Sequence, residues 1–523
     1  MLSRSPLYLL TGKYDKIQGV KQFYKFKSGG KIMAKIQTEL YETEDYTIEY
    51  SCNSRTKTKQ IKIKRISLKH NVEEIILPCT INNMLVTGID IGIKASQSYK
   101  ASTSRYVCKK LVLPSTLKSL SKGAFREADF FDELYVPKSI SVIPEECFAF
   151  SSLKKITFED ESVITGIMER AFIHSKIKEF HCPINCDYIG DSCFMHSKLE
   201  KITGMENVVV IDIGAFAETS NLTGVFNWPR KCTEIKDSTF DGSAISGISG
   251  IEEVVEIGRS AFADTSNLTG TFIWPKKCTE IKSSTFIGSS IKGISGIENV
   301  TKIGYNAFRF TQEMTGVFAW PKKCIAINEG TFYRSAISGI SGIDDVVEIG
   351  AMAFRNTTNM TGIFNWPPKC PIIKPGTFYK SAISGISGIE CVKEIRKYAF
   401  AGTPNLSGEF LWPENCAVIN EGTFSGSAIT GISGIDKVTE IGYLAFANSA
   451  LNNIVVGERL NSISLYAFAE KSKPTSKVHM DFAACEKLTI NTNPHHSIEG
   501  LRDILHTFFK DAHFPFDAEI EVK

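Results

Sequence analysis

GVFNWPRKCTEIKDSTFDGSAISGISGIEEVVEIGRSAFADTSNLT at residues 224–269 is followed at residues 270–315 by GTFIWPKKCTEIKSSTFIGSSIKGISGIENVTKIGYNAFRFTQEMT. The two segments have the same length, and the positions at which they match include a Trp-Pro pair, a cysteine and the two phenylalanines of the ladder described below. A repeat of this kind adds hydrophobic core one unit at a time. The pattern therefore predicts a repeat array, and the chain of 523 residues is too long for one compact core.

The 46-residue period holds throughout the centre of the chain. Every tryptophan obeys it and is followed by proline, and a cysteine comes four residues after each tryptophan. The two sets are Trp228, Trp274, Trp320, Trp366 and Trp412, and Cys232, Cys278, Cys324, Cys370 and Cys416.

Phenylalanines divide each period into a coil of 24 residues and a coil of 22 residues. A period in the low twenties is the length of one leucine-rich-repeat coil. The ladder extends outward in both directions and consists of Phe125, Phe148, Phe172, Phe194, Phe216, Phe240, Phe262, Phe286, Phe308, Phe332, Phe354, Phe378, Phe400, Phe424, Phe446 and Phe468.

The residues around each phenylalanine also recur, as in IGRSAF (257–262) and IGYNAF (303–308). We expect the isoleucine and the phenylalanine to point inward, while glycine permits a tight bend and the small residue before phenylalanine lets neighbouring backbones approach. Proline follows Leu113, Val136 and Trp228, where it should end a short strand because it has no amide hydrogen for the ladder.

These motifs resemble the BspA-like leucine-rich repeats, whose consensus runs roughly L-x-x-I-x-L-P-x-x-[LV]-x-x-I-x-x-x-A-F. The clearest matches are LVLPSTLKSLSKGAF (111–125) and LYVPKSISVIPEECF (134–148). IILPCTINNMLVTGIDIGIKAS (75–96) resembles the first repeat of the family, with Ser96 in the place of phenylalanine. The resemblance covers about residues 70–470, and the central Trp-Pro and GISGI variants depart from the consensus.

The predicted fold is a right-handed, β-rich leucine-rich-repeat solenoid. Its coils would consist of short parallel strands joined by turns, with short helical or 3-10 segments on the convex side. We expect a solenoid over residues 71–470, with the 46-residue double repeats at about 204–446.

Atypical units should cover the two ends of the solenoid. YTIEYS (46–51) and KQIKIKRISL (59–68) alternate apolar and polar residues, which predicts a β-hairpin cap over residues 33–70. Residues 471–523 should form a C-terminal cap with a helix over 496–512 and a closing strand over 518–523. Residues 1–32 are interpreted as a leader or a disordered extension, because Met33 opens a segment that reads like a protein start.

Composition narrows the possible functions. The net charge of +3 does not favour a nucleic-acid partner. No segment has the roughly 18 apolar residues that would span a membrane, and the apolar piece at residues 7–10 is too short for a secretory signal. The missing signal favours a cytoplasmic location, whereas the family resemblance implies a secreted or cell-surface protein.

The cysteines are predicted to be buried and reduced. Members of the Cys232 ladder should lie about 10 Å apart, two strand spacings, whereas a disulfide needs Cα atoms within about 7 Å. Cys182 and Cys186, near His174 and His181, leave a metal site as a weaker alternative, but no second ligand pair accompanies them. We therefore predict no metal site and no cofactor.

Two surface features could bind a partner. The tryptophans could form an exposed stripe, although their position before proline favours the core. Charged residues recur with the same period and predict a basic ridge and an opposed acidic ridge. The basic ridge, the candidate partner site, consists of Arg230, Lys231, Lys276, Lys277, Lys322, Lys323 and Lys369; the acidic ridge consists of Glu252, Glu253, Glu298, Asp344, Asp345, Glu390 and Asp436.

Catalytic motifs are missing from the sequence: it has no P-loop, no G-x-S-x-G and no H-E-x-x-H. We therefore predict a non-catalytic module that binds a protein through an extended repeat surface. The resemblance implies adhesion, with a host or matrix protein as partner. Two alternatives stay open: an intracellular scaffold, and a polyanion or glycan binder that uses the basic ridge.

Overall fold

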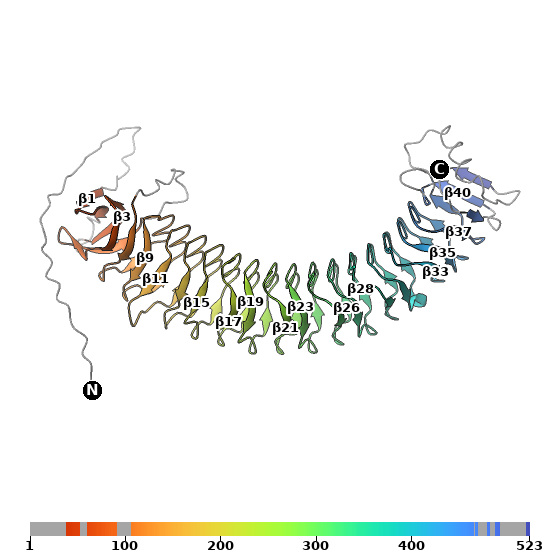
Figure 1. Ribbon diagram of the computed structural model, residues 1–523, viewed down its shortest axis with the longest axis horizontal. Coiled ribbons are helices and arrows are strands. Elements are labelled where there is room, and N and C mark those ends of the chain that lie inside the picture. Colours follow the sequence, from red (N-terminus) through yellow and green to blue (C-terminus); the bar gives the residue numbers. More distant parts are fainter. Residues whose placement is uncertain are drawn as a thin grey trace, which may run out of the picture. The chain divides into compact units, whose positions relative to one another are not determined.

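The computed structural model describes residues 38–52, 60–91, 106–464 and 466–468, and the strands at 479–481, 487–491 and 519–522 (Figure 1). The chain divides into two compact units, Met1–Asn207 and Val208–Lys523. The division falls close to the residue at which the sequence predicts the start of the double repeats. Each unit is described separately below.

The first unit begins with a β-sheet that is largely antiparallel. β2 and β3 pair antiparallel over the two segments in which the sequence predicts a hairpin, and β1 pairs antiparallel with β2. Ile48, Tyr50, Ile61 and Ile63 point to one face and are buried, as the alternation requires. The strands of this sheet are β1 (Thr38–Glu42), β2 (Tyr46–Cys52), β3 (Gln60–Leu68), β5 (Thr80–Ile81), β6 (Met84–Ile89) and β8 (Ser119–Leu120).

The coils of the first unit follow. Each has a long strand and, about a third of a coil later, a two-residue strand. The long strands form one uninterrupted parallel sheet: β4 (Val72–Ile76), β7 (Cys108–Val112), β9 (Phe131–Val136), β11 (Lys155–Phe158), β13 (Glu179–His181) and β15 (Lys201–Thr203). The short strands β10 (Val142–Ile143), β12 (Gly166–Ile167) and β14 (Tyr188–Ile189) pair in parallel on a second side.

The phenylalanine ladder forms the core of both units, as the sequence predicts. In the first unit the rings of Phe148 and Phe172 are stacked with centroids 5.1 Å apart. In the second unit the centroids of Phe286 and Phe308 lie 5.9 Å apart, and those of Phe332 and Phe354 lie 5.8 Å apart. All of these rings are fully buried, so each coil contributes one aromatic layer to the core.

In the second unit the long strands form separate pairs instead of one sheet. Each strand before a Trp-Pro motif pairs in parallel with the GIS strand of the next coil, but that GIS strand does not pair with the Trp-Pro strand after it. These pairs are β17 (Gly224–Asn227) with β19 (Ile245–Ser249), β21 (Gly270–Ile273) with β23 (Ile291–Ser295), β25 (Val317–Ala319) with β27 (Gly339–Ser341), β29 (Ile363–Asn365) with β31 (Gly385–Ser387), and β33 (Gly408–Leu411) with β35 (Ile429–Ser433). Beyond the last Trp-Pro motif, β37 (Asn453–Val455) pairs in parallel with β39 (His479–Asp481).

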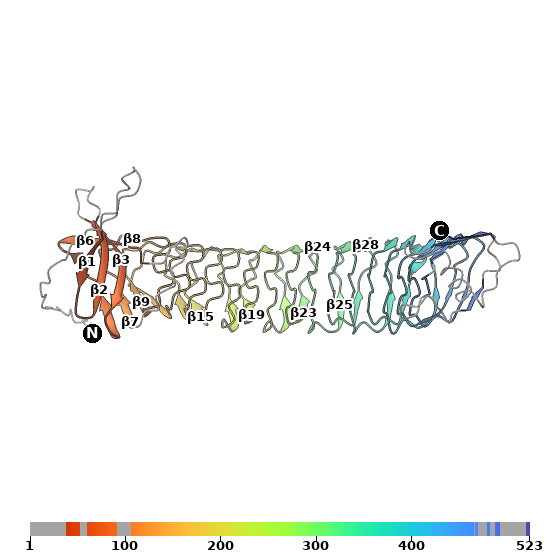
Figure 2. The same cartoon turned by 90° about the horizontal axis from the view of Figure 1, so that it is seen from above.

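The short strands of the second unit lie on the opposite side, as Figure 2 shows for β24 and β28 against β23 and β25. They are β16 (Val210–Ile211), β18 (Glu234–Ile235), β20 (Glu256–Ile257), β22 (Glu280–Ile281), β24 (Lys302–Ile303), β26 (Ala326–Ile327), β28 (Glu348–Ile349), β30 (Ile372–Ile373), β32 (Glu394–Ile395), β34 (Val418–Ile419), β36 (Glu440–Ile441), β38 (Ser462–Ser464), β40 (Lys487–Asn491) and β41 (Glu519–Val522).

Two kinds of interface therefore alternate along the second unit. We call an interface joined where the long strands pair and open where they do not. At a joined interface the Trp228 carbonyl oxygen would lie only 2.6 Å from a Cβ on Gly250, whose φ is +79°, so the two coils approach closely. Across an open interface the Asn267 side-chain amide donates to the Ala244 carbonyl at 3.3 Å.

The turns that carry the phenylalanines stay hydrogen-bonded at both kinds of interface. The Phe240 amide donates to the Ala261 carbonyl at 3.0 Å across an open interface. The Phe262 amide donates to the Thr285 carbonyl at 2.9 Å across the joined interface that follows. This continuous ladder holds consecutive coils together where the long strands separate.

Turns replace most of the helical segments that the sequence predicts. Among the described residues the one helical segment is a 3-10 turn at Ile389–Cys391. The predicted helix over 496–512 lies outside the described residues. The closing strand is present as β41, which pairs in parallel with β40. The described part of the chain contains no helical segment with the length and hydrophobicity of a membrane span.

Candidate binding surfaces

The long strands of the second unit expose one branched aliphatic residue each. Side chains alternate between the two faces of a strand, so burial of the central phenylalanine turns its two neighbours outward. In β17 Phe226 is buried and Val225 is 61% exposed, and in β21 Phe272 is buried and Ile273 is 72% exposed. The same exposure recurs at Val317, Ile363, Leu411 and Val455. We call this the long-strand face.

The GIS strands leave these aliphatic side chains uncovered. A Cβ on Gly247 would lie 3.5 Å from the Val225 side chain, and one on Gly385 would lie 3.4 Å from the Ile363 side chain. Glycine at these positions therefore keeps the long-strand face flat around Val225 and Ile363. The Ser387 hydroxyl donates to the Asn365 side-chain oxygen at 2.7 Å beside it.

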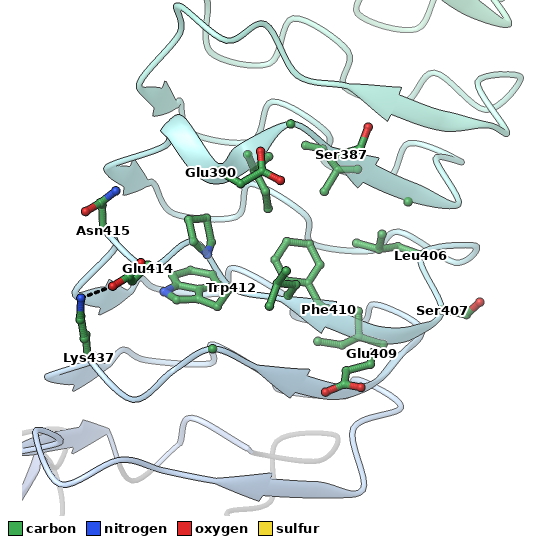
Figure 3. Close-up of a pocket in the computed structure, with 18 of the residues that line it drawn as sticks. Ser387, Glu390, Leu406, Ser407, Glu409, Phe410, Trp412, Glu414, Asn415 and Lys437 are labelled. Carbon is green, nitrogen blue, oxygen red and sulfur yellow. Dashed lines mark hydrogen bonds and ion pairs between the residues drawn. The ribbon is translucent and has the colours of Figure 1, made fainter.

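Two of the open interfaces in front of a Trp-Pro strand have a cleft on this same face. The cleft between β31 and β33 has a volume of about 760 Å³, and its lining includes Leu406, Phe410 and Trp412 (Figure 3). The cleft between β19 and β21 has a volume of about 580 Å³, and its lining includes the corresponding Leu268, Phe272 and Trp274. Aliphatic and aromatic side chains thus line both clefts at the same places in the repeat.

The two clefts differ in charge. Glu390, Glu409 and Asp436 line the cleft between β31 and β33, where Glu414 also forms an ion pair with Lys437 (Figure 3). The cleft between β19 and β21 instead has one acidic and one basic residue, Glu252 and Lys276. The repeat therefore preserves the apolar lining and varies the charge.

The predicted basic residues follow the first four of the five Trp-Pro pairs and are exposed. Lys277 Nζ lies 2.6 Å from a Glu253 carboxylate oxygen, and Lys369 Nζ lies 2.7 Å from Asp345. The hydrogen bonds to these lysines lower the pKa of Glu253 and of Asp345. The prediction of two opposed ridges is wrong at these coils, because residues 24 apart in the sequence lie in neighbouring coils and pair.

The tryptophan and cysteine ladders belong to the core. The tryptophans are 1–4% exposed, and the Trp274 indole donates to the Cys278 carbonyl at 3.0 Å. Burial raises the pKa of Cys278, Cys324 and Cys416 to about 12. The core interpretation of both ladders is confirmed, and an exposed tryptophan stripe is excluded.

Cys182 and Cys186 are both buried and share a hydrogen bond between their side chains, which raises the pKa of Cys182. Their neighbouring histidines turn to other partners: His181 Nδ1 lies 2.9 Å from the Thr203 hydroxyl, and His174 stacks between Phe150 and His196. No group of three His, Cys, Asp or Glu side chains among the described residues is placed to hold a metal ion.

A further row of side chains was not singled out from the sequence. It consists of the residues one and two positions after each ladder phenylalanine, which we call the turn edge. From Arg309 to Lys380 this edge carries stacked cations and aromatic rings. Reading these two positions as columns down the repeat would have revealed the row.

The sequence matches the family profile described as BspA type Leucine rich repeat region (6 copies) over residues 100–200, 187–315, 279–407, 325–450 and 393–490. No curated protein matches the chain. A leucine-rich repeat protein from Bacteroides ovatus is similar in structure, with 20% identity and a TM-score of 0.59, over 75% of this chain and 100% of its own.

Two other solved structures are more distant. A leucine rich cell surface protein from Faecalibacterium prausnitzii is 18% identical over 75% of this chain and 94% of its own, with a TM-score of 0.33. The pneumococcal vaccine antigen PcpA is 14% identical over 92% of this chain and 98% of its own, with a TM-score of 0.26.

Proposed function

Because the chain belongs to the family of BspA-type leucine-rich repeat proteins, we propose that it is a non-catalytic binding protein that presents the long-strand face of its second unit to a protein partner. The observation that carries the proposal is the row of exposed aliphatic side chains, one on each strand before a Trp-Pro motif. Adhesion at a cell surface, with a host or matrix protein as partner, is the role that the family resemblance supports.

The regular spacing of this row is what supports binding. A single exposed aliphatic residue is ordinary on a protein surface, but one such residue on every strand before a Trp-Pro motif provides a repeated apolar contact area. The clefts between the strand pairs add sites into which aromatic or aliphatic side chains of a partner can insert. A row of this length fits a macromolecule better than a small ligand, which would need one enclosed site.

Charges beside the long-strand face would supply specificity. The ion pairs Lys277–Glu253 and Lys369–Asp345 lie at the Trp-Pro turns, and the cleft between β31 and β33 is acidic. Charges at the rim of an interface mainly select the partner and set the association rate. The change of charge from one cleft to the next therefore fixes the direction in which a partner binds along the array.

The test compares two double variants of equal charge. Val317→Glu with Ile363→Glu places two carboxylates on the long-strand face. Val255→Glu with Val347→Glu, the control, places two carboxylates outside that face, where the wild-type side chains are 48% and 43% exposed. We expect the first pair to abolish capture of the partners that the wild-type chain retains from a host-cell extract, measured by quantitative mass spectrometry. The proposal fails if both pairs, or neither, reduce capture.

A polyanion or glycan is the second candidate ligand. Arg230, Lys276 and Lys322 are exposed and form no ion pair with another described residue, so they can bind anions. Replacement of all three by glutamine should lower the salt concentration that elutes the chain from heparin. An unchanged elution would remove this candidate. An intracellular scaffold, the third candidate, predicts a fully reduced cytosolic pool in thiol labelling of fractionated cells.

A further inference from the structure

The turn edge of the second unit holds a row of alternating cations and rings. Across four consecutive coils the two positions after the ladder phenylalanine are Arg309 and Phe310, Tyr333 and Arg334, Arg355 and Asn356, and Tyr379 and Lys380. The ladder rings beneath them advance by 5.6, 5.8 and 5.7 Å from coil to coil. The row therefore presents four positive charges along about four coils.

The rings hold the cations in place. Arg309 Cζ lies 4.6 Å from the ring centroid of Phe310 and 4.5 Å from that of Tyr333. Arg355 Cζ lies 4.4 Å from the centroid of Tyr379 and 5.4 Å from that of Tyr333. Cation–π stacking orders the guanidinium groups before any ligand arrives, so less side-chain entropy is lost on binding.

These cations lack anionic partners within the described part of the chain. None of Arg309, Arg334, Arg355 and Lys380 takes part in an ion pair there. The Nε atoms of Arg309 and Arg355 are buried and have no hydrogen-bond acceptor. A stacked guanidinium group still offers the N–H groups at its edge, and a carboxylate can accept two of them at once.

The surroundings of the row limit the length of its ligand. On the N-terminal side the same two columns carry Glu218, Asp241 and Asp264, separated from Arg309 only by Ile287 and Gly288. On the C-terminal side they continue with small residues. A long polyanion that extended toward the N-terminal side would meet these carboxylates. The faces of the rings are covered by cations, so they cannot stack nucleic-acid bases.

We propose that the turn edge from Arg309 to Lys380 binds an extended acidic segment of a partner protein. The residues on one side of an extended chain recur about every 6.6 Å, close to the advance of the coils. About five or six residues of such a segment would span the row. This surface is separate from the long-strand face, so the proposal does not depend on the function proposed above.

The experiment measures the anisotropy of a fluorescein-labelled peptide, Gly-Ser-Glu-Ser-Glu-Ser-Glu-Gly, on titration with the full chain at low ionic strength. We expect saturable binding that weakens with added salt, and no binding of the same peptide with glutamine in place of glutamate. Arg309→Gln with Arg355→Gln should weaken binding about tenfold or more. A wild-type chain that does not bind the peptide overturns the proposal.

A matched control separates this site from net charge. Lys176→Gln with Lys198→Gln removes the same charge from exposed positions in the first unit, and it should change the affinity less than about twofold. Tyr333→Leu keeps every cation but removes the ring between two arginines, and it should weaken binding about threefold. Thermal unfolding of each variant establishes that it is folded. Equal losses in the two charge variants would contradict the proposed site.

Competition identifies the class of ligand. A heparin hexasaccharide and a six-nucleotide oligothymidylate are each titrated against the bound peptide. We expect the unlabelled peptide to displace the probe at the lowest concentration. Displacement by either of the other two at a lower concentration than the peptide shows that the row binds a polysaccharide or a nucleic acid, and overturns the choice of an acidic protein segment.

Discussion

The first unit has an unbroken long-strand sheet, whereas the long strands before and after each Trp-Pro motif of the second unit are joined only in pairs, although coils of the same length occur in both units. The coil from Phe148 to Phe172 has 24 residues, like every coil with a Trp-Pro motif. In that first-unit coil the inward residue of the long strand, Ile156, comes eight residues after the phenylalanine. In the Trp-Pro coil that starts at Phe262, the inward Phe272 comes ten residues after it.

The position of two residues therefore distinguishes the two units. We infer that the offset is tolerated where a Trp-Pro strand meets the next GIS strand, as Phe226 meets Ile248, and opens the sheet where a GIS strand meets the next Trp-Pro strand. In the first unit the two extra residues follow the long strand, near Glu159–Ser162, and β11 still pairs with both neighbours. In the second unit they precede the strand, whose start is displaced from the previous coil. An insertion of two residues preserves which side chains face inward, because strand side chains have a period of two. The core is kept while one strand interface opens.

The largest expected effect tests the feature that the two units share. Phe308→Ala should lower the free energy of unfolding by about 3–5 kcal/mol, because it leaves a cavity in the aromatic ladder. Chemical denaturation followed by circular dichroism measures it. Phe310→Ala, at the half-buried turn edge, is the control and should cost less than about 1.5 kcal/mol. Equal costs would mean that the ladder is not the core.

A pair of glycines distinguishes the joined from the open interface. Gly250 has φ +79° and its Cβ would lie 2.6 Å from the Trp228 carbonyl, whereas Gly270 has φ +91° and no atom within 4 Å of its Cβ. Alanine should therefore cost about 2–4 kcal/mol at Gly250, from strain and a clash, and about 1–2 kcal/mol at Gly270, from strain alone. The difference in denaturation midpoint measures the contrast, and a larger cost at Gly270 would refute it.

Removal of the two extra residues should close an open interface. With Ser266 and Asn267 deleted, Phe272 would come eight residues after Phe262, and β21 should pair with β19. Hydrogen exchange of the amides in these two strands should then slow about tenfold, which corresponds to about 1.4 kcal/mol. Deletion of Asp160 and Glu161, after the strand β11, is the matched control and should leave exchange in β11 unchanged. Unchanged exchange in β21 would contradict the explanation.

The smallest effect depends on pH. Burial, and then the charges of Asp264 and Glu218, raise the pKa of Asp241 to about 6. The folded state then holds this proton more tightly than the unfolded state, so stability from this group falls as pH rises from about 4 to about 6. Asp241→Asn should stabilise the chain at pH 7 by about 1 kcal/mol, after allowance for solvent screening, and have less effect at pH 4. Melting temperatures that shift equally at both pH values would contradict it.

Much of the fold could be predicted because its signal is local and repeated. Phe308 and Trp320 recur with a fixed period, and a buried position in one coil must be buried in the next. The sequence pattern located the basic residues but not their ion-pair partners, because Lys277 pairs with Glu253 of the neighbouring coil. The row from Arg309 to Lys380 was missed because it covers only two of the 46-residue repeats, so each of its two columns holds only two cations.

The amino-acid sequence by itself determines that the chain coils with a period in the low twenties and which residues face inward, because burial of one apolar side in a repeated unit leaves a periodic pattern. Only the tertiary structure decides where strands separate and which charges meet. Those outcomes depend on the stacking of one coil against the next, and a displacement of two residues changes the strand pairing without changing the apolar period.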